Sequence, residues 1–137
     1  MASLIYNSAL EDEAKGAIDY DTDTFKTLLV TSSYTPNKDT HTRRSDITNE
    51  VSGTGYTAGG ATSACTVAKD NATDRVTLTF AAVSWANATI TARGAVIYKS
   101  TGTAANDPLV GYVDFGADVS RTASPFSLSS SVITKQN

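Results

Sequence analysis

The stretch "TSACTVAKDNATDRVTLTF", Thr62 to Phe80, decides the fold class of this chain. Apolar and polar residues alternate on either side of its centre, and the centre, "DNATD", consists largely of residues that favour turns. Alternation with a period of two, broken once by a turn, predicts a β-hairpin with one buried face and one face in water. The residues expected on the buried face are Cys65, Val67, Val76, Leu78 and Phe80.

Several other short apolar segments continue this pattern along the chain. The segment "FKTLLV", Phe25 to Val30, ends in three consecutive apolar residues, which is typical of a strand that is buried on both faces. Gly94 interrupts a later segment and indicates either a β-bulge or a close crossing of two backbones. The remaining strands are predicted at Val83–Trp85, Ile90–Ser100 and Leu109–Gly116, and within Pro125–Thr134.

A short helix is predicted ahead of the first of these strands. Ser8 and Glu11 have the spacing of a capping box, Leu10 begins an apolar repeat at helical intervals, and Gly16 is suited to end the helix. The residues before the helix form an apolar arm, which must either fold back on the domain or dock on another molecule. The apolar residues of this arm are Leu4, Ile5 and Tyr6.

Together these elements predict an all-β fold: an antiparallel β-sandwich or a jelly-roll-like barrel with one short N-terminal helix. A chain of 137 residues has the length of one domain. We therefore expect a single β-rich domain over residues 1–137, with the arm at 1–7, the helix at 8–17 and the β-sandwich at 24–133.

The composition argues against several classes of partner and cofactor. The net charge is -3, from 14 acidic and 11 basic residues without a block of like charge, so a nucleic acid is not expected as a partner. Cys65 is the only cysteine, which excludes an intramolecular disulfide and a multi-cysteine metal site. We expect no cofactor, no membrane partner and, because the first residues do not have the pattern of a signal peptide, synthesis in the cytoplasm.

The acidic segment "DYDTDT" places carboxylates at Asp19, Asp21 and Asp23, the spacing with which a calcium-binding loop begins. Such a loop also needs Gly at its sixth position and Glu at its twelfth, where this chain has Thr24 and Val30. We therefore favour a solvated entry into the first strand, with Thr22 and Thr24 on the opposite face. A looser metal site at the three aspartates is the weaker hypothesis.

The remaining polar and aromatic candidates favour contact roles over catalysis. His41 is the only histidine and lies in a polar loop away from any recognisable nucleophile, so we expect no catalytic residue. Cys65 and Trp85 are interpreted as core residues, and the four glycines around Tyr56 as a mobile or sharply bent loop that is able to order on contact with a neighbour. The residues expected to make intermolecular contacts are Leu4, Ile5, Tyr6, His41, Arg43, Arg44 and Tyr56.

Long motifs of the chain resemble a family of small virion structural proteins from tailed bacteriophages. They are "IDYDTDTFKTLLVTSSYTPNKDTHTRRSDITNEVSGTGYTAGG", "VSWANATITARGAVIYK" and "LVGYVDFG", and the resemblance covers residues Leu4 to Gly116. It implies a β-rich decoration, or cement, protein on the outside of the phage head. Such proteins are often trimers, and the implied partners are the major capsid protein and further copies of this chain, in the virion.

Two other functions remain open from the sequence. A component of the tail, baseplate or fibre that binds the host surface would place Trp85, Tyr56 or Tyr34 on an exposed, sugar-binding face. A small hydrolase of the cell wall or of a surface polysaccharide would instead use His41 together with Asp19, Asp21 and Asp23.

Overall fold

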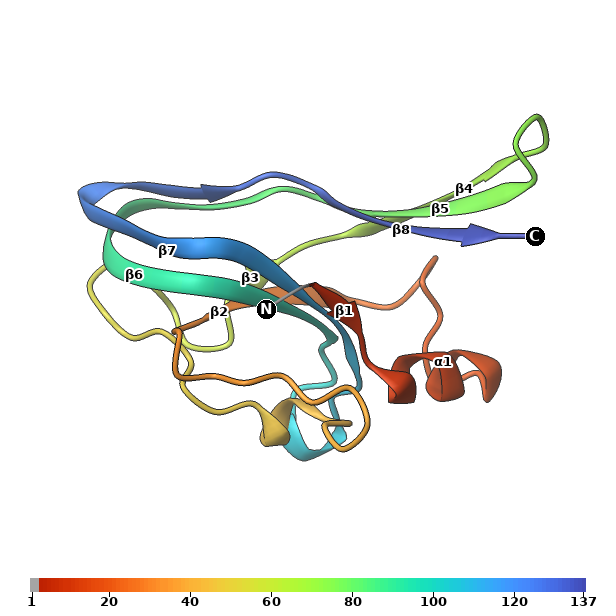
Figure 1. Ribbon diagram of the computed structural model, residues 1–137, viewed down its shortest axis with the longest axis horizontal. Helices are drawn as coiled ribbons and strands as arrows, with labels where there is room; N and C mark the ends of the chain where they lie inside the picture. Colours follow the sequence, from red (N-terminus) through yellow and green to blue (C-terminus); the bar gives the residue numbers. More distant parts are fainter. Residues whose placement is uncertain (1–2) are drawn as a thin grey trace.

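The computed structural model describes residues 3–137, which contain two antiparallel β-sheets and one short α-helix (Figure 1). The five-stranded sheet has the strand order β1-β7-β6-β2-β3, and the three-stranded sheet has the order β4-β5-β8. The expected all-β class is therefore confirmed. The elements are β1 (Leu4–Ile5), α1 (Asn7–Ala14), β2 (Phe25–Val30), a 3-10 turn η1 (Arg44–Asp46), β3 (Ala61–Thr62), β4 (Cys65–Asp70), β5 (Arg75–Phe80), β6 (Val83–Lys99), a second 3-10 turn η2 (Ala104–Asn106), β7 (Leu109–Leu128) and β8 (Ser131–Gln136).

The strands β6 and β7 form a long antiparallel ribbon that folds back on itself (Figure 1). Four separate strands were predicted in this region, but β6 joins Val83–Trp85 to the segment that follows, and β7 continues from Leu109 to Leu128. The ribbon bends because its register shifts at several points, one of them between Ala92 and Gly94. The ring of Tyr112 also packs directly on Gly94, so the glycine marks both a bulge and a close approach.

The predicted hairpin is present as β4 and β5, paired from Cys65↔Phe80 to Asp70↔Arg75. Its buried face is smaller than expected, however, because β4 is the outermost strand of its sheet and is exposed after its first residue. The prediction that Val67 is buried is therefore wrong: its exposed fraction is 38%. Cys65 is half-buried at the margin of the core.

The helix α1 forms near the expected position but with a different cap and a different buried face. Its N-cap is Tyr6, which makes no side-chain capping hydrogen bond, so the predicted capping box is absent. Leu10 is 51% exposed, whereas Ala9 and Asp12 are buried. The face is set by tertiary contacts of Asp12 rather than by the apolar repeat. Gly16 follows the helix with φ +79°, a conformation that favours glycine, and ends it as predicted.

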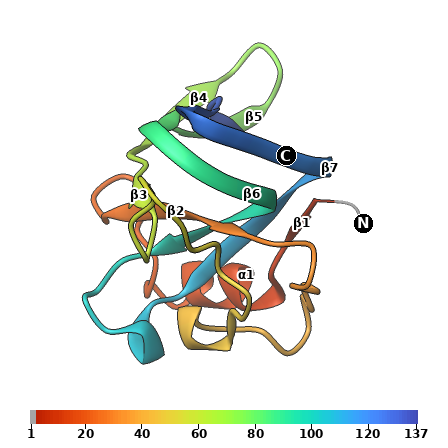
Figure 2. The ribbon, with the colours of Figure 1, turned by 90° about the vertical axis from the view of Figure 1, so that its left-hand side faces the viewer.

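The two sheets meet through aromatic side chains. Phe25 of β2 and Phe80 of β5 have ring centroids 5.4 Å apart at an interplanar angle of 83°, and Tyr20 stacks on Phe25 at 5.5 Å. Figure 2 shows α1 on the opposite side of the large sheet from the hairpin β4–β5. Within residues 3–137, no helix has the length and apolar character needed to cross a membrane.

Candidate functional site

The amino-terminal arm folds back on the domain. Leu4 and Ile5 form β1, which pairs with β7 through Leu4↔Tyr112 and Ile5↔Gly111. The backbone N–H of the next residue, Tyr6, donates to the carbonyl oxygen of Val110 at 3.2 Å. The side chain of Tyr6 is completely buried, so of the three apolar residues predicted to make contacts, Leu4 and Ile5 are the two with exposed surface.

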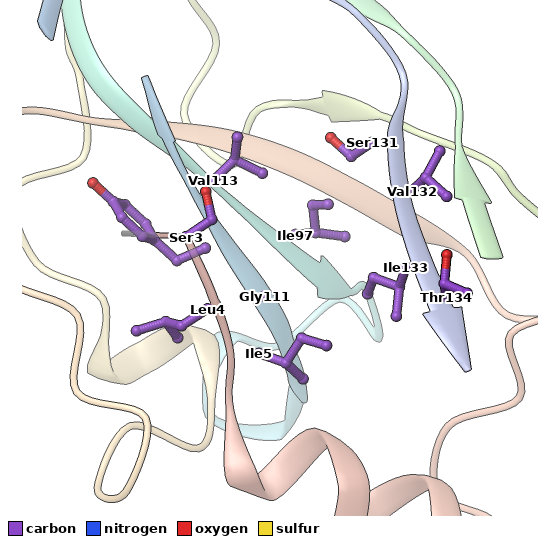
Figure 3. Close-up of a pocket in the computed structure, with 11 residues that line it drawn as sticks. Ser3, Leu4, Ile5, Ile97, Gly111, Val113, Ser131, Val132, Ile133 and Thr134 are labelled. Carbon is purple, nitrogen blue, oxygen red and sulfur yellow. The ribbon is translucent and has the colours of Figure 1, made fainter. Parts of the chain in front are cut away.

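An open, largely apolar groove of about 460 Å³ lies between β1 and β8 (Figure 3). Its floor is formed by Ile97 of β6 and by Gly111 and Val113 of β7. Ile5 from one wall and Ile133 from the other point into the space between the strands (Figure 3). Among residues 3–137, no charged side chain lines this groove, which we call the edge groove.

Both walls of the edge groove are outermost strands of their sheets. β1 ends the five-stranded sheet and β8 ends the three-stranded sheet, so each has one side without a neighbouring strand among residues 3–137. Such a side presents backbone N–H and C=O groups to which another strand can bind. Each wall also carries an exposed apolar side chain: Val132 is 56% exposed and Ile5 is 39% exposed. The two walls are therefore suited to bind an extended segment.

His41 belongs to a hydrogen-bonded cluster of aromatic residues under the arm. The hydroxyl groups of Tyr6 and Tyr34 are 2.8 Å apart, and the Tyr34 hydroxyl is 2.9 Å from Nδ1 of His41. Burial raises the pKa of Tyr34 to about 12. This cluster ties the loop that carries His41 to the arm, which gives His41 a structural role within the chain.

The two neighbouring arginines also make contacts within the chain. Nη1 of Arg43 donates to Oδ2 of the buried Asp12 at 2.8 Å, and Nη2 lies 3.4 Å from Oδ1. Arg44 forms an ion pair with Asp107, with Nε 3.5 Å from Oδ2, and its guanidinium lies over the ring of Tyr98 at 5.4 Å. Arg43, the N-cap of η1, and Arg44, its first residue, thereby link this turn to other parts of the fold.

Tyr56 is held in place by the half-buried carboxylate of Glu50. Its hydroxyl donates to Oε2 of Glu50 at 2.6 Å and accepts from the N–H of Leu29 at 3.0 Å. The same Oε2 accepts from the N–H of Gly59 at 2.7 Å. Trp85 is buried and its ring lies 5.3 Å from that of Tyr56. The glycine-rich loop is therefore packed against β2 and β6 in the chain itself, so its order does not depend on a neighbouring molecule.

The aspartates of the acidic segment form a turn rather than one face of an extended strand. The N–H of Asp21 donates to Oδ1 of Asp19 at 3.0 Å, and the N–H of Asp19 donates to Oδ2 of Asp23 at 2.8 Å. Asp23 also forms an ion pair of 2.9 Å with Lys99. Within residues 3–137, no three His, Cys, Asp or Glu side chains are grouped in a way that could hold a metal ion.

Only one wall of the edge groove, Leu4 and Ile5, was predicted from the sequence. Leu4 and Ile5 were named as contact residues, but Val132 and Ile133 were not, because the last strand was predicted only as a segment within Pro125–Thr134. The signal was the adjacent apolar pair of β-branched residues, Val132 and Ile133, directly after the serine run. Of the aromatic residues that would form a sugar-binding face, Trp85 and Tyr34 are buried.

No family model, curated protein or solved structure matches this chain.

Proposed function

We propose that this chain is a non-enzymatic structural protein of a tailed-bacteriophage virion, and that it binds the outer surface of the head as a decoration protein. In this proposal it is made in the host cytoplasm and assembles with the major capsid protein and with copies of itself, as a trimer. The two sheets, which meet at Phe25 and Phe80, would then be the layers of a β-sandwich.

The single observation that carries the proposal is the edge groove between β1 and β8. An extended segment of a neighbouring subunit can add to an outermost strand through main-chain hydrogen bonds, while pockets such as the one at Ile97 and Ile133 take its apolar side chains. Such contacts are modest for one copy, but in a shell many copies act together. The assignment to a phage virion itself rests on the resemblance of the sequence motifs to virion structural proteins.

The test is binding of the full chain to phage heads that lack it, followed by cryo-electron microscopy of the particles. We expect density on the icosahedral shell and hundreds of copies in each virion. Density confined to the tail, or a few copies at one vertex, would refute the decoration role and favour the tail or baseplate alternative.

Three matched variants test the groove itself. Val132→Lys and Ile5→Lys place a charge on each wall, and Leu10→Lys places the same charge on an exposed apolar residue of α1 outside the groove. Burying an apolar side chain contributes about 1.5–3 kcal/mol, so each groove variant should weaken head binding about ten-fold or more. Equal binding by all three variants and the unmodified chain would exclude the edge groove as the binding surface.

A further inference from the structure

A second groove, of about 450 Å³, lies between the hairpin β4–β5 and the segment that links α1 to β2. In Figure 1 the hairpin lies at the upper right, and α1, which precedes the segment on the other side of the groove, lies at the lower right. Apolar side chains from both sides line it, and Val67 of β4 leaves 38% of its surface open to solvent. The apolar lining residues are Ile18, Tyr20, Val67, Val76 and Leu78.

The rim of this groove carries an excess of negative charge. Glu13, Asp19 and Asp21 line it, and the one cation among its lining residues, Lys135, forms a 2.7 Å ion pair with Glu13. Within residues 3–137, neither Asp19 nor Asp21 forms an ion pair with a cation. A hydrogen bond from the N–H of Asp21 holds the pKa of Asp19 below its usual value, which keeps that carboxylate charged at neutral pH.

We propose that this acidic groove binds a segment of a partner protein in which a lysine or arginine flanks a large apolar side chain. The apolar side chain would cover Val67 and Val76, and the cation would pair with Asp21 at the rim. The groove has the size and the apolar lining of a side-chain pocket. The proposal goes beyond the assembly function above, because this groove shares none of its lining residues with the edge groove.

Charge complementarity selects this occupant over others. Carboxylates on the rim repel nucleic acids, anionic lipid headgroups and acidic peptides, and they attract a cation that approaches with an apolar group. The described residues that line the edge groove carry no charge, so that groove can bind an uncharged strand. The two grooves should therefore differ in how strongly salt affects binding.

The test uses the full chain labelled with nitrogen-15 and a synthetic peptide, acetyl-Gly-Lys-Leu-Arg-Gly-amide, followed by NMR. We expect the amide signals of Asp21, Val67 and Val76 to shift, and binding to weaken as the salt concentration rises from about 0.01 M to about 1 M. Asp21→Asn should weaken binding about two- to five-fold, as for a partly exposed ion pair. Val67→Lys should weaken it about ten-fold or more, because the charge both displaces the apolar contact and repels the peptide.

Val132→Lys is the matched control, since it makes the same change at an exposed valine of the other outermost strand in the same sheet. It should bind the peptide as the unmodified chain does. The proposal is overturned if the peptide acetyl-Gly-Glu-Leu-Glu-Gly-amide binds as well, if the shifts map to the edge groove, or if Val67→Lys binds normally. It is also overturned if the same signals shift with protein concentration alone, because the occupant would then be a second copy. Because Val67 is exposed, Val67→Lys should still fold. Asp21→Asn tests the contribution of the rim charge independently.

Discussion

Replacing Arg43 by alanine should destabilise the fold far more than the same substitution at an exposed arginine would. The substitution leaves the buried carboxylate of Asp12 without its cation, and breaking a fully buried pair in this way costs about 3–5 kcal/mol. The Arg43 side chain is 33% exposed and that of Asp12 is 10% exposed, so we expect the lower end, about 3 kcal/mol. For 137 residues, an unfolding entropy of about 0.29 kcal/mol/K converts this to a fall in Tm of about 10 °C.

The assay is urea and thermal unfolding followed by circular dichroism, with three further variants. Asp12→Ala should cost about 1.5 kcal/mol, because the partly exposed guanidinium of Arg43 can return to water while the carboxylate cannot. The double variant should cost less than the sum of the two single changes. Lys15→Ala removes the exposed ion pair with Glu11 and should leave the Tm unchanged. Unaltered stability of Arg43→Ala, together with loss of head binding, would refute the structural role and restore Arg43 as a contact residue.

Three further predictions concern other parts of the chain. Gly60→Ala should lower the free energy of unfolding in urea by about 2–5 kcal/mol, because φ is +81° and the new Cβ would collide with the carbonyl of Thr27. Gly102→Ala, at φ +96° in open space, should lower it by only about 1–2 kcal/mol. Equal losses of stability in the two variants would contradict the steric argument. Burial raises the pKa of Cys65 to about 11, so iodoacetamide at pH 8 should modify this thiol about a hundred-fold more slowly than an exposed thiol. The rate of modification should rise as the pH approaches 11. Fast labelling of the folded chain at pH 8 would be inconsistent with a buried thiol. Millimolar calcium should leave the Tm unchanged, since the turn in Asp19–Asp23 occupies its carboxylates with backbone N–H groups and a lysine; a rise in Tm would revive the metal hypothesis.

Local pattern was sufficient for the strands whose environment follows from their own residues. β2 is apolar at successive positions and lies in the interior of its sheet, and the hairpin β4–β5 follows from alternation around a turn-forming centre. These predictions succeeded because a period of two, or a continuous apolar run, is a property of neighbouring residues.

Features that depend on distant residues could not be predicted in this way. The buried face of α1 is the one that carries Asp12 rather than the apolar repeat, because Asp12 pairs with Arg43 from a distant loop. Arg43 itself was predicted to contact another molecule, since nothing in its neighbourhood in the sequence indicates a buried carboxylate. Tyr56 was predicted to lie in a mobile or sharply bent loop and to contact another molecule for the same reason, because its partners Glu50 and Leu29 depend on how that loop crosses the sheet.

What the sequence by itself determined is the β-rich class, the hairpin, strand β2 and the apolar character of Leu4 and Ile5. The tertiary structure alone decided that the arm pairs with β7, that the β6–β7 ribbon folds over, and that β1 and β8 border one groove. The physical reason is that alternation reports which side of a strand is apolar, whereas pairing and packing between opposite ends of the chain decide which apolar side remains open to a partner.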